Sequence, residues 1–186
     1  MTRIFLLLLI ALMCAPAAFS QNKDYSYYEF YVGYAYERVD NDAGTFDKKK
    51  THGATVNIAS GNRNYNGFMA EFNQNVTRRV GIVTSFSGTY QDSRQRYDLM
   101  IGPRYNWRTE GVTPFVHGLF GVSHVRAEVD DRTRSATAFA MAFGGGLDVH
   151  AGDHLDVRVI QVDYLPTFFN GKRQDNIRAS AGIKIK

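Results

Sequence analysis

Cysteine and long apolar runs are both scarce in this chain of 186 residues. Its one cysteine, Cys14, lies within the first 20 residues, so residues 21–186 can form no disulfide and carry no thiolate chemistry. Apart from residues 4–13, no apolar run approaches the roughly 20 residues that a membrane-spanning helix needs. If residues 21–186 cross a membrane, they must cross it as strands.

An excess of one charge sign is also missing. The formal net charge is only +4 at pH 7, and lysine and arginine do not gather into a stripe. A dedicated nucleic-acid-binding protein would show such a stripe, so the sequence argues against that class.

The first 20 residues have the pattern of a secretory signal peptide. Arg3 supplies the positive start, residues 4–13 the apolar centre, and Ala18 and Ser20 the small residues before the cleavage point. An uncleaved anchor is disfavoured because the apolar run is too short. Lipidation at Cys14 is disfavoured because Leu12 and Met13 are larger than the residues that normally precede a lipidated cysteine. We expect cleavage after Ser20, leaving one domain over residues 21–186; N-terminal sequencing would read this site directly.

Alternation of apolar with charged or small residues is the dominant pattern of the remaining chain. The last segment shows it most clearly: one face carries Ile177, Ala179, Ala181, Ile183 and Ile185, and the other carries Arg178, Ser180, Gly182, Lys184 and Lys186. Successive strand side chains point to opposite sides of a sheet. Each such strand therefore separates an oily environment from a wet or ion-paired one.

The alternation recurs in eight segments, which predict strands over residues 28–39, 67–73, 80–91, 97–108, 114–126, 139–149, 155–165 and 177–186. A short β piece is predicted at residues 54–58, inside a long polar loop. Further loops are predicted at 128–135 and 166–174, and short turns at 74–79, 92–95, 109–112 and 151–154. Long connections alternating with short ones are typical of outer-membrane barrels.

A sheet that spans a membrane has to close, because unpaired backbone groups are very costly in hydrocarbon. Eight antiparallel strands leave an interior only wide enough for side chains. In the segment 155–165 the alternation slips, and a β-bulge near Val159 and Ile160 would restore it. The predicted inward charges are seven acids and five bases, which we expect to pair as a structural plug: Glu29, Glu37, Glu71, Asp98, Asp148, Asp156, Asp163, Arg104, Arg108, Arg158, Arg178 and Lys184.

Four stretches resemble strand signatures of a known family. They are Ile101-Gly102-Pro103-Arg104-Tyr105, Thr113-Pro114-Phe115-Val116-His117-Gly118, Ala142-Phe143-Gly144-Gly145-Gly146-Leu147-Asp148 and Gln161-Val162-Asp163-Tyr164-Leu165. The chain resembles the small outer-membrane β-barrel proteins related to the OmpA transmembrane domain and OmpX. The resemblance implies an all-β, eight-stranded antiparallel up-and-down transmembrane β-barrel in the bacterial outer membrane. It also implies a monomer that is inserted by the outer-membrane assembly machinery, although this chain ends in Ile185-Lys186 where the family usually has an aromatic residue.

Catalytic and metal-binding candidates are few. His150 and His154 bracket a turn that contains Asp153, but no third ligand is evident, and His52 lies in the first long loop. His117 is a candidate lumen residue beside a carboxylate. Because no Ser, His and Asp arrangement stands out, we predict no catalytic residue, no metal and no cofactor. The glycine run 144–146 has no helix after it, which favours close strand packing over a phosphate cradle.

The first long loop carries three successive lysines, Lys48, Lys49 and Lys50, which are either plainly solvated or in contact with phosphates of lipopolysaccharide or another anionic surface. The leading hypothesis is an outer-membrane barrel, in contact with the lipid bilayer, that acts structurally or in adhesion-like recognition through its outer loops. One alternative is a narrow gated passage for ions or small solutes. A second is a soluble barrel for a lipophilic ligand, which predicts the opposite sidedness, with aromatics lining a cavity.

Overall fold

The computed structural model describes residues 25–39, 63–92, 94–129, 132–169 and 172–186. The expected signal peptide, the three lysines at positions 48–50, His52 and the β piece at 54–58 lie outside these residues. In the described part of the chain, no helix has both the length and the apolar character to cross a bilayer.

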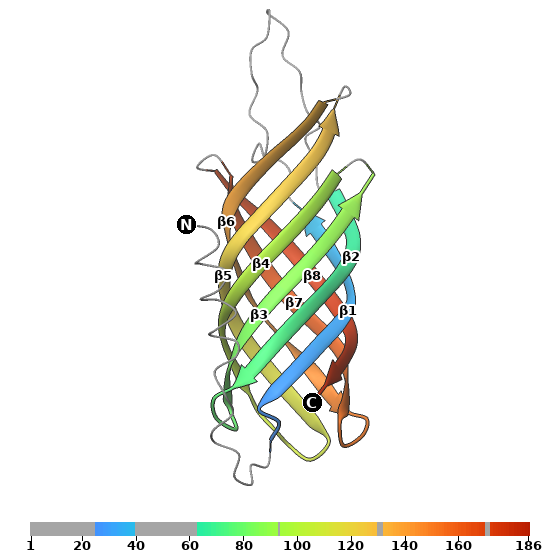
Figure 1. Cartoon of the computed structure of the whole chain (residues 1–186), viewed down its shortest axis with the longest axis vertical. Coiled ribbons are helices and arrows are strands. Elements are labelled where there is room, and N and C mark those ends of the chain that lie inside the picture. Colours follow the sequence, from blue (N-terminus) through green and yellow to red (C-terminus); the bar gives the residue numbers. More distant parts are fainter. Residues whose placement is uncertain (1–24, 40–62, 93, 130–131, 170–171) are drawn as a thin grey trace, which may run out of the picture.

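The described residues form eight strands, and each pairs antiparallel with the next along the chain (Figure 1). β8 then pairs antiparallel with β1, which closes the sheet into a barrel. The predicted fold class is therefore confirmed. The strands are β1 (Tyr28–Val39), β2 (Arg63–Asn75), β3 (Val80–Gln91), β4 (Arg94–Asn106), β5 (Val112–Val129), β6 (Arg132–His150), β7 (Leu155–Phe169) and β8 (Lys172–Ile185).

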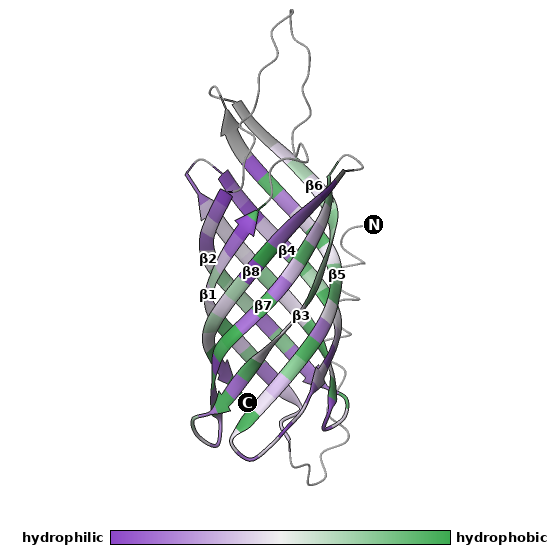
Figure 2. Ribbon diagram, turned by 180° about the vertical axis from the view of Figure 1, so that it is seen from behind, coloured by the Kyte–Doolittle hydropathy of each residue, from purple (hydrophilic) through white to green (hydrophobic). Residues whose placement is uncertain are grey.

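The two faces of the barrel wall differ in the way that the alternation predicts. On β1, Phe30, Val32 and Tyr34 are exposed on the outside, whereas Glu29 and Glu37 are buried inside. Hydrophilic and hydrophobic residues alternate along the strands around the barrel (Figure 2). This sidedness is opposite to that of a soluble barrel with a lipophilic cavity.

The predicted bulge in β7 is confirmed. The register of β7 against β8 shifts between Arg158 and Gln161, and the register against β6 shifts between Leu147 and Asp148. Val159 and Ile160 are both about half exposed on the outer face, whereas Arg158 and Gln161 are fully buried. The extra residue therefore keeps polar side chains inside on both sides of the bulge.

Two predicted loops are wrong, because the strands continue through them. β5 runs to Val129 and β6 begins at Arg132, so most of the predicted loop 128–135 is paired β structure. In the same way, β7 and β8 extend through most of the predicted loop 166–174. These segments are polar, and composition alone had suggested loops; strand pairing through the backbone does not require apolar side chains outside a membrane.

The two ends of the barrel are unlike each other. The termini end carries Tyr25, Lys186 and the three turns at residues 76–79, 107–111 and 151–154. At the opposite, distal end, three of the four connections have only two residues. A short turn was predicted for the one between β3 and β4, whereas the longer loops predicted for the other two are wrong. The fourth, residues 40–62, lies outside the described residues.

At the distal end, β5 and β6 continue as a long hairpin where a loop was predicted. β5 and β6 rise above the other strands at that end (Figure 1). Their pairing continues to Val129 and Arg132, whereas the pairing of β6 with β7 begins only at Phe139. The β5–β6 hairpin therefore extends past the neighbouring strand β7.

Candidate functional site

The lumen contains all twelve charged residues predicted to point inward. Eleven of them are at most 2% exposed, and Arg108, at the termini end, retains 9% of its side-chain exposure. A buried charge without a partner would destabilise the folded state by roughly several kcal/mol. The partners of each charged group therefore determine what the lumen can do.

The densest cluster lies nearer the termini end and is built around Arg158. Its guanidinium lies 2.6 Å from a Glu71 oxygen and 2.7 Å from an Asp148 oxygen. Arg104 approaches the same two carboxylates at 3.4 and 3.2 Å, and Lys184 lies 2.8 Å from Asp148. Two carboxylates thus bridge three cations contributed by three different strands.

Two aromatic rings complete this cluster. The guanidinium carbon of Arg158 lies 4.0 Å from the centre of the Tyr31 ring and 4.4 Å from that of Phe115. Arg104 lies 3.5 Å from the Phe115 ring centre. Cations over ring faces are stabilised by the ring quadrupole, so these aromatics hold the arginines in place from the sides that carry no carboxylate.

A second cluster lies around Asp163. Arg178 donates to its Oδ2 at 2.8 Å, the Nε2 of His117 lies 2.9 Å from its Oδ1, and the Gln161 amide donates to both oxygens. His117 is therefore a lumen residue beside a carboxylate. Gly144 makes room for this arrangement, because a Cβ there would lie 2.2 Å from Asp163 Oδ1.

A third cluster is closer to the distal end and centres on Arg96. Its Nε lies 3.2 Å from both Glu37 and Asp98. The Thr89 hydroxyl donates to Glu37 as well. Val125 is the register partner of Arg96, and it packs with Ala138 and Phe169 in a buried apolar group.

The termini end holds the fourth cluster. Arg108 lies 2.7 Å from Glu29, and Asp156 accepts contacts from Lys184 at 2.9 Å and Lys186 at 2.8 Å. The Nδ1 of His150 also lies 2.7 Å from Asp156. This cluster forms the boundary between the filled lumen and the solvent at that end.

The sequence reasoning missed two lumen cations, Arg96 and Lys186. Arg96 lies two positions before Asp98, and Lys186 lies two positions after Lys184. Each therefore faces the same side of its strand as a charge that was predicted to point inward. Arg96 was overlooked because a turn was predicted at residues 92–95, whereas β4 already begins at Arg94. With both included, seven acidic side chains face seven basic ones, and each lies within 3.2 Å of an opposite charge.

No group of three metal-ligating side chains occurs among the described residues. His150 lies against Asp156, and its Nε2 lies 3.3 Å from the Thr109 carbonyl. The turn that separates His150 from His154 is exposed. The charged side chains of the lumen thus have one another as partners.

The combined features define a class of protein. A closed sheet of eight antiparallel strands with an apolar exterior and a charged, filled interior is the architecture of small transmembrane barrels. The model of the outer membrane protein beta-barrel domain matches residues 5–184 of the chain. The chain therefore belongs to the outer membrane protein beta-barrel family, and it is embedded in the lipid bilayer of a bacterial outer membrane.

Solved structures show the same fold at low sequence identity. Ail, the attachment invasion locus protein of Yersinia pestis, is 20% identical with a TM-score of 0.53, covering 84% of this chain and 97% of Ail. Ail was also solved in complex with the heparin analogue sucrose octasulfate. Neisserial surface protein A is 10% identical with a TM-score of 0.62, covering 87% of this chain and 97% of that protein. No curated protein matches the sequence.

Proposed function

We propose that the chain is a closed, non-conducting outer-membrane barrel that acts in surface recognition at its distal end. The observation that carries this proposal is the lumen, in which seven carboxylates and seven cations are paired within 3.2 Å, and twelve of these fourteen groups are at most 2% exposed. A solute could pass only by separating such pairs, and each separated buried charge would cost several kcal/mol, roughly. The barrel then serves as a rigid anchor.

The distal end supports the recognition role. The β5–β6 hairpin extends past β7, and Arg126, before its tip, is exposed on the outer face. Lys48, Lys49 and Lys50 belong to the connection at the same end, and in this proposal they contact an anionic partner. The name of Ail denotes attachment, and its complex with a heparin analogue provides a chemical class to test.

The closed lumen predicts a negative result in planar bilayers. The purified chain should insert without producing stable single-channel steps, because a solute would have to separate buried ion pairs. The variants Arg104→Gln and Glu71→Gln, each of which removes one charge of the plug, serve as comparison. Stable steps in the unsubstituted protein whose size changes in these variants would support the gated passage and would contradict the plug.

The recognition role predicts that bacteria displaying the protein are retained on heparin-coated beads. Replacing Lys48, Lys49 and Lys50 by glutamine should remove most of this retention, and added salt should weaken it, because exposed charges are screened. The matched control is Arg78→Gln together with Arg79→Gln, which removes cations from the opposite end of the barrel. Equal retention by the lysine variant and the original protein would refute an anionic partner at this loop.

A further inference from the structure

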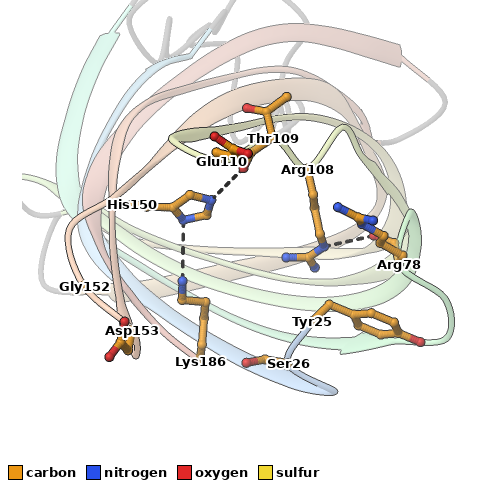
Figure 3. A pocket seen from close by; sticks show the side chains of 10 residues that line it. All are labelled: Tyr25, Ser26, Arg78, Arg108, Thr109, Glu110, His150, Gly152, Asp153 and Lys186. Carbon is orange, nitrogen blue, oxygen red and sulfur yellow. Dashed lines mark hydrogen bonds between the residues drawn. The ribbon is translucent and has the colours of Figure 1, made fainter. Parts of the chain in front are cut away.

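A cavity of about 650 Å³ opens at the termini end of the barrel. It is lined by residues from all three turns and by both ends of the described chain, including Tyr25, Arg108, His150 and Lys186 (Figure 3). Its volume lies within the range of small-molecule sites. We propose that this cavity binds a small zwitterion, an amino acid or a short peptide, with the carboxylate directed inward.

The cavity is closed on its inner side. The lining residues Arg108 and Lys186 contact Glu29 and Asp156, and Lys184 joins these two carboxylates. Glu29, Asp156 and Lys184 are at most 2% exposed, so this part of the ion-pair network forms the floor of the cavity. A molecule that enters from the termini end therefore stops at this floor. The cavity is a binding pocket and not the entrance of a channel, which makes this inference separate from the surface role at the distal end.

The inner wall presents a fixed cationic group. The Arg108 guanidinium donates from Nη2 to Glu29 at 2.7 Å and from Nε to the Arg78 carbonyl at 2.9 Å. Neither of these bonds uses its Nη1 group. Because two bonds already fix its orientation, Arg108 can donate to a ligand carboxylate without losing further side-chain freedom.

Two further cations border the same space. Lys186 lies 2.8 Å from Asp156, and its side chain points toward His150 across from Arg108 (Figure 3). Arg78 lines the cavity too, and its guanidinium has no ion-pair partner in the part of the chain that the structure describes. Arg78 and the Nη1 group of Arg108 can therefore donate charge-assisted hydrogen bonds to a carboxylate.

The outer rim has the opposite charge. Glu110 and Asp153 line the cavity from two different turns, and both are exposed. Neither carboxylate has an ion-pair partner among the described residues. Cations on the inner wall and carboxylates at the rim match a ligand that places its carboxylate inward and its ammonium group at the rim. An amino acid or a short peptide carries both groups, whereas inorganic phosphate has no ammonium group.

Calorimetric titration of the full-length protein in detergent micelles tests the proposal, with the dipeptide alanyl-alanine as the probe. The dipeptide should bind at about millimolar concentrations, and its C-terminal amide should bind about tenfold more weakly or worse. The N-acetylated dipeptide should also bind more weakly, because it lacks the ammonium group. Inorganic phosphate should bind more weakly than the dipeptide.

A matched pair of variants locates the site. Arg78→Gln should weaken dipeptide binding by about tenfold, whereas Arg79→Gln, in the same turn but not lining the cavity, should leave it unchanged. Both arginines are exposed, so neither change should affect folding. The proposal is overturned if alanyl-alanine does not bind, if the amide or phosphate binds as well as the dipeptide, or if both variants bind alike.

Discussion

Arg158→Met is expected to lower the free energy of unfolding by about 3–5 kcal/mol, the range seen when one partner of a buried ion pair is removed. The substitution keeps much of the side-chain volume but leaves Glu71 and Asp148 without their shortest contacts, at 2.6 and 2.7 Å. Urea unfolding of the protein in lipid vesicles, followed by the gel shift between folded and unfolded forms, measures the loss.

Two further variants separate charge from volume. Arg173→Met removes an arginine of the same kind whose side chain is 60% exposed, and it should change stability by less than about 1 kcal/mol. The double variant Arg158→Met with Glu71→Gln removes one charge of each sign, and it should recover part of the loss. If Arg158→Met were as stable as Arg173→Met, the ion pairs would not hold the lumen together.

Adding a charge to the outer face should destabilise the barrel about as much as removing one from the lumen. Ile101 lies near the middle of the outward-facing run of β4, is 54% exposed, and lies beside Thr84 and Phe120 on the neighbouring strands. Ile101→Arg should cost about 2–4 kcal/mol, the range for a cationic side chain at the bilayer midplane. The same vesicle unfolding measurement provides the value.

Val76→Arg is the matched control for this prediction. Val76 is also 54% exposed, but it lies in a turn at the termini end, where an arginine reaches water. The cost there should be about 0–1 kcal/mol. Equal costs at positions 76 and 101 would mean that Ile101 does not face hydrocarbon.

Much of the barrel wall was predictable because its signal is local. A strand between hydrocarbon and a polar lumen must alternate residue by residue, so each segment carries its own sidedness. Even the bulge was visible, because Arg158 and Gln161 could both lie inside only if Val159 and Ile160 both faced outward. The inward set followed directly from this alternation.

The distal ends of β5 and β6, residues 127–129 and 132–138, were not predictable, because outside the bilayer neither face of a strand needs to be apolar. Segments such as residues 128–135 therefore had a loop-like composition although they pair. The same physics hid Arg96, which lies close to the polar start of β4.

Composition and alternation were thus sufficient to establish a barrel wall with a lipid face and a charged face, because each strand meets both environments along its own length. The partners inside were decided by tertiary structure alone. Arg158 and Glu71 are 87 positions apart, and Arg178 bonds to Ser87 across 91 positions. Such pairs depend on how the closed sheet staggers its strands, and so does the cavity at the termini end, where three turns and both ends of the described chain converge.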